Sequence, residues 1–80
     1  MTDFDIQITV GLVEDGTQTR AVVVYALGEQ RFDGVGLARR SPEDPSVPEV
    51  GEELASSRAF SDLAHQLLDA ATERIATFGQ

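Results

Sequence analysis

The chain has 80 residues, no cysteine and a formal net charge of −8, from 14 acidic residues against six arginines. This length makes one domain near the lower limit of what folds alone, so we expect a single domain over residues 1–80. Without cysteine there is no disulfide framework, thiolate metal cluster or thiol nucleophile. The negative field repels polyanions at long range, which disfavours general nucleic-acid binding.

The N-terminal segment MTDFDIQITV is acidic where a secretory signal is basic. No apolar run in the chain approaches the roughly 18 residues that a membrane span needs. We therefore expect a cytoplasmic protein with no membrane contact.

The first element is a strand from Phe4 to Leu12, where apolar residues alternate with polar or small ones. This period of two is typical of a strand with one buried face. Asp15 and Gly16 follow, a pair that favours a type I′ hairpin turn. The next strand therefore runs back antiparallel.

The second strand, from Thr19 to Leu27 (TRAVVVYAL), is apolar on both faces. In a three-stranded meander this strand is central, and an apolar second face needs cover. Val22 and Val24 lie on that second face and are expected to be exposed in a lone monomer. They predict the interface of a homodimer.

The third strand, from Arg31 to Arg39, follows a turn at residues 28–30 and carries Gly34 and Gly36 on one face. The G-x-G-x-x-G fingerprint of a dinucleotide site fails, because Arg39 stands where a third small residue belongs and no helix follows directly. Glycines within a strand instead indicate close approach of another element.

Two helix-start patterns lie in the loop after the third strand. Residues 41–44 (SPED) resemble a helix start that Pro45 limits to one turn. Ser46 and Glu49 have the spacing of a capping box, which predicts a second short turn or the true helix start. The acidic cluster here suits the positive end of a helix dipole better than a calcium site.

A long amphipathic helix is predicted from Glu52 to Phe78. Its apolar arc consists of Phe60, Leu63, Ala64, Leu67, Leu68, Ala71, Ile75 and Phe78. Its polar side consists of Arg58, Asp62, His65, Gln66, Asp69 and Glu73. The order β-β-β-α predicts an α+β fold with a three-stranded antiparallel meander, a loop and one C-terminal helix in two layers.

A metal or catalytic site is weakly supported. Asp62, His65 and Asp69 have the i, i+3, i+7 spacing of helix ligands, but surface ion pairs share this spacing and Arg58 is placed to pair with Asp62. His65 is the single histidine, and no serine has an identifiable base beside it. We therefore expect no catalytic, cofactor or metal site, no small-molecule substrate, and a non-enzymatic protein.

The run from Gly34 to Leu68 resembles the signature of a small actinobacterial family of unknown function. The matching pieces are GVGLAR, VPEVGEEL and SRAFSDLAHQLL. The resemblance implies a fold like the double-stranded-RNA-binding domain without its N-terminal helix, and frequent dimers. It also implies a link to dormancy or stress and a likeness to ribosome hibernation-promoting factors.

Two functions follow from these observations. The first is a stress- or dormancy-associated protein that binds the ribosome or structured RNA, with Arg39, Arg40 and Arg58 as candidate phosphate contacts. Two of these arginines end the third strand, and the third lies near the helix start. The alternative is a dimeric protein-interaction module with no nucleic-acid partner, which the net charge and the apolar strand face favour.

Overall fold

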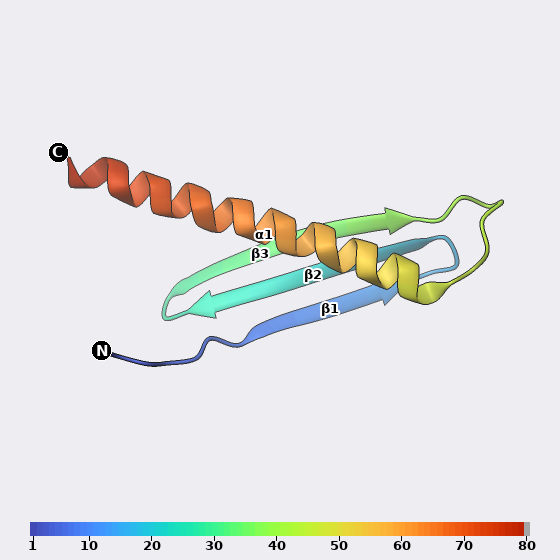
Figure 1. The fold of residues 1–80 in the computed structure, drawn as a ribbon, viewed down its shortest axis with the longest axis horizontal. Coiled ribbons are helices and arrows are strands. Elements are labelled where there is room, and N and C mark those ends of the chain that lie inside the picture. Colours follow the sequence, from blue (N-terminus) through green and yellow to red (C-terminus); the bar gives the residue numbers. More distant parts are fainter. Residues whose placement is uncertain (80) are drawn as a thin grey trace.

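The computed structural model describes residues 1–79. The chain forms β1 (Ile8–Glu14), β2 (Gln18–Leu27), β3 (Gln30–Arg39) and α1 (Pro48–Phe78) in that order. The strands make one antiparallel sheet in the order β1-β2-β3, and α1 crosses one face of it (Figure 1). This confirms the predicted α+β meander with a C-terminal helix.

Strand β1 begins later than predicted, at Ile8 rather than Phe4, and ends at Glu14 rather than Leu12. The first residue in the ladder is Ile8, which pairs with Tyr25 of β2. Alternation at residues 4–7 marked which side chains are apolar, but a strand requires a hydrogen-bonding partner as well. The predicted boundaries of β2 and β3 are each within one residue of the observed ones.

The first hairpin turn is not of type I′. That turn requires positive φ, and among residues 1–79 only Gly28 has it, at 60°. The Asp15 carboxylate instead accepts hydrogen bonds from the backbone amides of Thr17 (2.9 Å) and Gln18 (2.8 Å). Because this side chain closes the turn, Gly16 needs no left-handed backbone.

The pairing register sorts the strand residues into two faces. The face toward α1 carries Ile8, Val10, Leu12, Thr19, Ala21, Val23, Tyr25, Phe32, Gly34, Gly36 and Ala38. The opposite face, called the helix-free face below, carries Thr9, Gly11, Val13, Arg20, Val22, Val24, Ala26, Arg31, Asp33, Val35, Leu37 and Arg39.

Gly34 and Gly36 allow α1 to lie directly on β3. A Cβ atom on Gly34 would overlap the carbonyl oxygen of Ala59, and one on Gly36 would overlap that of Ala55. Both obstacles are helix backbone, which cannot move aside as a side chain can. The predicted close approach of another element to this face is confirmed, and that element is α1.

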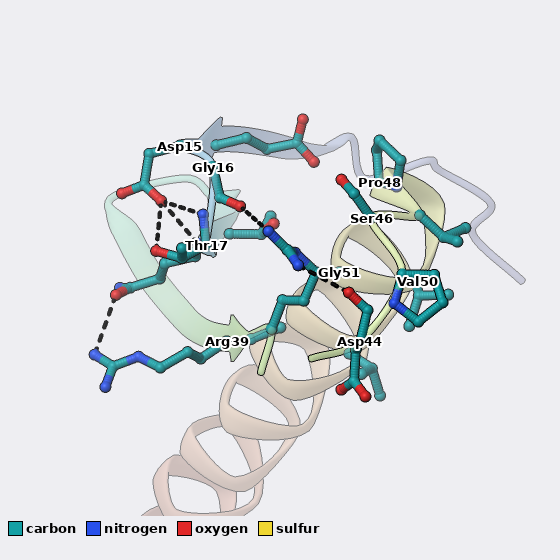
Figure 2. A pocket seen from close by; sticks show the side chains of 17 residues that line it. Asp15, Gly16, Thr17, Arg39, Asp44, Ser46, Pro48, Val50 and Gly51 are labelled. Atoms are coloured by element: carbon teal, nitrogen blue, oxygen red, sulfur yellow. Dashed lines mark hydrogen bonds between the residues drawn. The ribbon is translucent and has the colours of Figure 1, made fainter. Parts of the chain in front are cut away.

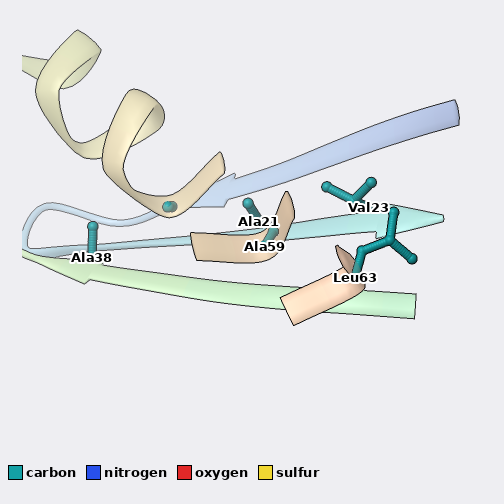
Figure 3. Packing of buried hydrophobic residues seen from close by; sticks show 6 residues of the cluster. Ala21, Val23, Ala38, Ala59 and Leu63 are labelled. Carbon is teal, nitrogen blue, oxygen red and sulfur yellow. The ribbon is translucent and has the colours of Figure 1, made fainter. Parts of the chain in front are cut away.

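The buried core is small. It consists of Ala21, Val23, Ala38, Ala55, Ala59 and Leu63 (Figure 3). Tyr25 and Phe32 both pack against this core. Their two rings meet edge to face, with centroids 6.0 Å apart. Four of the six core residues are alanines, so the helix comes close to the sheet but buries little apolar area per residue.

The start of α1 differs from the predicted capping box. The helix begins at Pro48, four residues before the predicted start at Glu52 and within the segment named as a possible true helix start, but its N-cap is Val47 rather than Ser46. Pro48 at the first helical position has no N–H, so it leaves one fewer unpartnered amide at the start of the helix. The predicted single turn before it is confirmed, because the Asp44 amide donates to the Ser41 carbonyl oxygen at 3.0 Å.

Helix α1 is longer than the sheet beneath it. Its 31 residues span about 46 Å at 1.5 Å per residue, whereas a ten-residue strand spans about 34 Å. Its C-terminal turns therefore extend beyond the strands, as Figure 1 shows. Within residues 1–79, no helix combines the length and apolar character that crossing a membrane requires.

Candidate functional site

A row of polar side chains on α1 binds the outer edge of β3. Arg58 donates to the Leu37 carbonyl oxygen at 2.7 Å, and Gln66 donates to the Asp33 carbonyl oxygen at 2.8 Å. Between them, the carboxylate of Asp62 accepts the Val35 amide at 2.8 Å. These contacts occupy backbone groups that a fourth strand would otherwise pair.

The polar side of α1 is therefore only partly a solvated face, because Arg58 and Asp62 contact β3 instead of forming the predicted surface pair. His65 lies near in sequence, but its Nδ1 is 2.8 Å from the Ser61 carbonyl oxygen of its own helix. In the part of the chain that the structure describes, no three His, Asp or Glu residues are grouped to hold a metal ion.

A pocket of about 420 Å³ lies at the end of the sheet near the start of α1 (Figure 2). Its walls come from the β1–β2 turn, the end of β3 and the loop before α1. This volume is in the range of small-molecule sites. The hydroxyl of Thr17 lies 3.2 Å from the Asp15 carboxylate, but backbone amides lower the pKa of that carboxylate. Asp15 is therefore a weak base, poorly suited to activating a nucleophile.

Arg40 holds this pocket together. Its guanidinium donates to the carbonyl oxygens of Asp44 at 2.9 Å and Gly16 at 3.1 Å (Figure 2). Its backbone amide donates to the carbonyl oxygen of Thr17 at 2.8 Å. Arg40 thus ties the loop before α1 to the β1–β2 turn. Its neighbour Arg39 extends the other way, toward Gln18.

Two carboxylates near the pocket have shifted pKa values. A hydrogen bond with Glu14, together with the charge of that residue, raises the pKa of Glu52 above its ordinary value. The backbone amides of Thr17 and Gln18 lower the pKa of Asp15. This contact joins the end of β1 to the first turns of α1, and ionisation of Glu52 weakens it.

The helix-free face concentrates positive charge. Arg20, Arg31 and Arg39 all lie there, and the only acidic strand residue on it is Asp33, which pairs with Arg31 at 3.0 Å. Half of the chain's arginines therefore share one face of a protein whose net charge is −8. The face of the sheet toward α1 carries no arginine from the strands.

The structure separates the three arginines that the sequence singled out. Only Arg39 lies on the helix-free face, whereas Arg40 closes the loop and Arg58 binds the edge of β3. Arg20 and Arg31 were missed. The alternation that places Gly34 and Gly36 on one face of the third strand also places Arg31 and Arg39 together on the other. The sequence therefore contained the information that Arg31 shares a face with Arg39.

Val22 and Val24 lie on the helix-free face as predicted, but they are half-buried rather than exposed. As residues of the central strand they are shielded by side chains of the strands on either side. The exposed large apolar side chains of this face are Val13 on β1 and Val35 and Leu37 on β3.

The fold and the site define a small α+β protein with a clamped sheet edge and an arginine-bearing sheet face. The Rv2632c-like family model matches residues 4–80, and the chain belongs to this family. The uncharacterized protein Rv2632c of Mycobacterium tuberculosis is 46% identical over 61 residues, 76% of this chain and 66% of that protein. The uncharacterized protein MT1780 of the same species is 40% identical over 68 residues, 85% of this chain and 72% of that protein.

The crystal structure of Rv2632c has the same fold. It matches with a TM-score of 0.89 and 38% identity, over 96% of this chain and 92% of that chain. In the sequence comparison, by contrast, the matched part of this chain spans slightly less than two thirds of the length of Rv2632c. The resemblance to an actinobacterial family of unknown function is confirmed at the level of these mycobacterial proteins.

Proposed function

We propose that this chain is a non-enzymatic binding protein whose helix-free face binds an anionic macromolecule, with the structured RNA of the ribosome as the partner. The supporting observation is the placement of Arg20, Arg31 and Arg39 on one face with a single acid. A local positive surface attracts phosphate even when the whole chain is acidic.

The composition of this face defines the kind of contact. Arg31 and Arg39 are eight residues apart on β3, about 27 Å at 3.4 Å per residue, so the arginines are spread along the face. None of its strand residues is aromatic, so bases have no ring on which to stack. The face is therefore suited to the phosphates of a folded RNA, independent of base sequence.

The physiological setting of the proposal comes from the family resemblance. A fold like the double-stranded-RNA-binding domain and a likeness to ribosome hibernation factors support action on cytoplasmic ribosomes in stress or dormancy. The proposal departs from that domain in one respect, because the contacts come from a sheet face and the start of α1 carries Glu49, Glu52 and Glu53.

Ribosome binding tests the proposal. Binding of the purified chain to ribosomal subunits should weaken steeply as salt rises, because each neutralised phosphate releases counterions. Replacing Arg20 and Arg39 together by Ala should reduce the slope of log K against log salt by about two if each arginine makes one contact. Co-sedimentation at several salt concentrations measures both quantities.

The matched control is Arg74→Ala, which removes an arginine from α1 rather than from the helix-free face. This variant should keep the wild-type slope. If the folded chain binds neither ribosomes nor structured RNA at low salt, or if the control and the double variant behave alike, the proposal is wrong.

A second function, a protein-interaction module without a nucleic-acid partner, is favoured by the apolar part of the same face. Val35 and Leu37 are 38% and 48% exposed and lie beside Val22. Capture of a protein partner should then depend little on salt, and Leu37→Lys should abolish it while the arginine variants leave it intact.

A further inference from the structure

The pocket at the end of the sheet contains a buried hydroxyl that the chain leaves without a partner. Among residues 1–79, Thr19 is the one buried polar side chain, with 7% of its surface exposed. Its hydroxyl makes no hydrogen bond with the described residues, and no fully enclosed side-chain oxygen or nitrogen among them lacks a partner. The hydroxyl therefore keeps a small opening, and Thr19 lines the pocket. A buried hydroxyl costs free energy unless some group bonds to it.

Two carboxylates lie close to this hydroxyl. The strand pairing places Glu14, Thr19 and Ala38 in one row across the sheet, on the side that faces α1. All three residues line the pocket. Directly paired residues have Cβ atoms about 4.5–5.5 Å apart, so the side chain of Glu14 starts beside that of Thr19. Glu52 reaches Glu14 from α1, which brings two carboxylates and one hydroxyl to the same end of the pocket.

The opposite wall of the pocket is apolar. It is formed by Pro45, Val47, Pro48, Val50 and Leu54 from the loop and the first turns of α1 (Figure 2). Val47, Val50 and Leu54 are 46%, 51% and 44% exposed, so the chain itself does not cover this wall. A cavity of about 420 Å³ with apolar walls and a few polar groups at one end is typical of a site for a small organic molecule.

The charge at the polar end of the pocket is negative. The pKa of Glu52 is raised by its hydrogen bond with Glu14 and by the charges of Glu14, Glu49 and Glu53. These carboxylates outweigh the positive end of the α1 dipole, which is equivalent to about half a charge. A cation bound beside Glu14 and Glu52 would offset the repulsion between them.

The two arginines that line the pocket do not reverse this preference. The guanidinium of Arg40 is already bonded to the carbonyl oxygens of Asp44 and Gly16. Arg39 lies on the helix-free face, opposite to Glu14 and Thr19, and its guanidinium extends toward Gln18. Neither arginine therefore places its charge at the polar end of the pocket.

We propose that this pocket binds a small primary amine, whose ammonium group donates to the carboxylates of Glu14 and Glu52 and to the hydroxyl of Thr19. An ammonium group has three N–H donors, which matches the three acceptors. Its apolar body would lie against the wall that includes Val47 and Leu54. The site faces away from the helix-free face, so it is independent of the proposed RNA binding.

Three analogues that differ in charge test the class of ligand. Phenethylamine is the probe, phenethyl alcohol is its neutral analogue and phenylpropionate is its anionic analogue. Titration followed by the amide chemical shifts in NMR spectra should show that the amine shifts residues 14–19 and 47–54. Because a hydrogen bond to a charged group is stronger than a neutral one, the alcohol should bind about tenfold more weakly. The anion should bind more weakly still.

Thr19→Val distinguishes a ligand-binding role from a structural one. Valine has nearly the same shape but no hydroxyl, so the melting temperature should stay the same or rise, because the lost hydroxyl has no partner in the chain. Affinity for phenethylamine should fall about tenfold. Thr9→Val, at an exposed position on the helix-free face, is the matched control and should keep the wild-type affinity. A lower melting temperature with unchanged affinity would show that Thr19 is structural and overturn the proposal.

Glu14→Gln tests the carboxylates at an exposed position, where the fold is not at risk. It should weaken phenethylamine binding about tenfold and remove most of the preference over phenethyl alcohol. Glu73→Gln, on the C-terminal part of α1, removes one charge far from the pocket and should keep that preference. The proposal is wrong if the amine shifts no amide of the pocket, if phenylpropionate binds as tightly, or if Glu14→Gln and Glu73→Gln behave alike.

Discussion

At the scale of single residues, Gly34 and Gly36 set the distance between α1 and the sheet. Each lies against backbone atoms of the helix, so the smallest side chain already meets an obstacle. The facing helix residues, Ala55 and Ala59, are small as well and completely buried. The close contact therefore depends on the absence of large side chains from both surfaces.

Gly36→Ala should destabilise the chain by about 1–3 kcal/mol, because the added methyl group pushes α1 away from β3. Urea unfolding followed by circular dichroism measures the change. Gly11→Ala is the matched control, since a Cβ atom on Gly11 meets no other atom within 4 Å. Equal stability of the two variants would contradict this close packing.

Glu52 makes stability depend on pH. Its pKa is raised in the folded chain by the hydrogen bond with Glu14 and by the charge of that residue. For an acid whose folded pKa lies above the unfolded one, the stabilising contribution is present at low pH. It is lost as pH rises through the folded pKa.

Glu52→Gln should therefore raise the melting temperature at pH 7 and lose this advantage as pH falls through the raised pKa of Glu52, where the wild-type side chain takes up a proton. Thermal melts across this range test the expectation. Glu73→Gln, on the C-terminal part of α1, removes one charge far from Glu14 and serves as control. A constant difference between Glu52→Gln and the wild type at all pH values would contradict the raised pKa of Glu52.

At the scale of elements, α1 takes the place of a fourth strand along β3. Arg58, Asp62 and Gln66 recur every four residues and meet alternate residues of the strand. Four helix residues advance about 6.0 Å and two strand residues about 6.8 Å, so the two repeats stay in approximate step over this length. The edge of β3 is thereby closed to another chain.

Asp62→Ala should destabilise the chain by roughly 0.5–1.5 kcal/mol, the usual net value of one hydrogen bond. It should also speed hydrogen exchange at the Val35 amide, which loses its acceptor. Asp62→Asn keeps a side-chain oxygen and should restore most of the protection. Asp69→Ala is the control on the same helix, and unchanged exchange at Val35 in Asp62→Ala would argue against the clamp.

At the scale of the whole molecule, the basic and acidic residues gather on different surfaces. The arginines of the sheet lie on the helix-free face, whereas the acidic cluster lies in the loop and the first turns of α1. Exposed apolar residues lie on β1 and α1, and Val35 and Leu37 of β3 lie among the arginines of the helix-free face. A net charge of −8 describes none of these faces by itself.

The sequence by itself determined the elements and their order. Alternation over β1, the paired glycines of β3 and the helical period from Glu52 onward each depend on neighbours within a few residues, so local pattern predicts them. The close approach to Gly34 and Gly36 was also predictable, because a glycine within a strand leaves room for a neighbouring backbone. The glycines did not by themselves indicate that this neighbour is α1.

Only the tertiary structure decided which polar residues are free. Arg40, Arg58 and Asp62 had the pattern of surface residues, yet each binds backbone groups of a distant segment, between 21 and 27 residues away in sequence. Ser46 had the right spacing for a cap, but the path of the loop placed Val47 there. The angle at which the long α1 crosses the sheet determines which side of each strand and of the helix is covered. Packing between distant segments sets this angle, and local pattern does not.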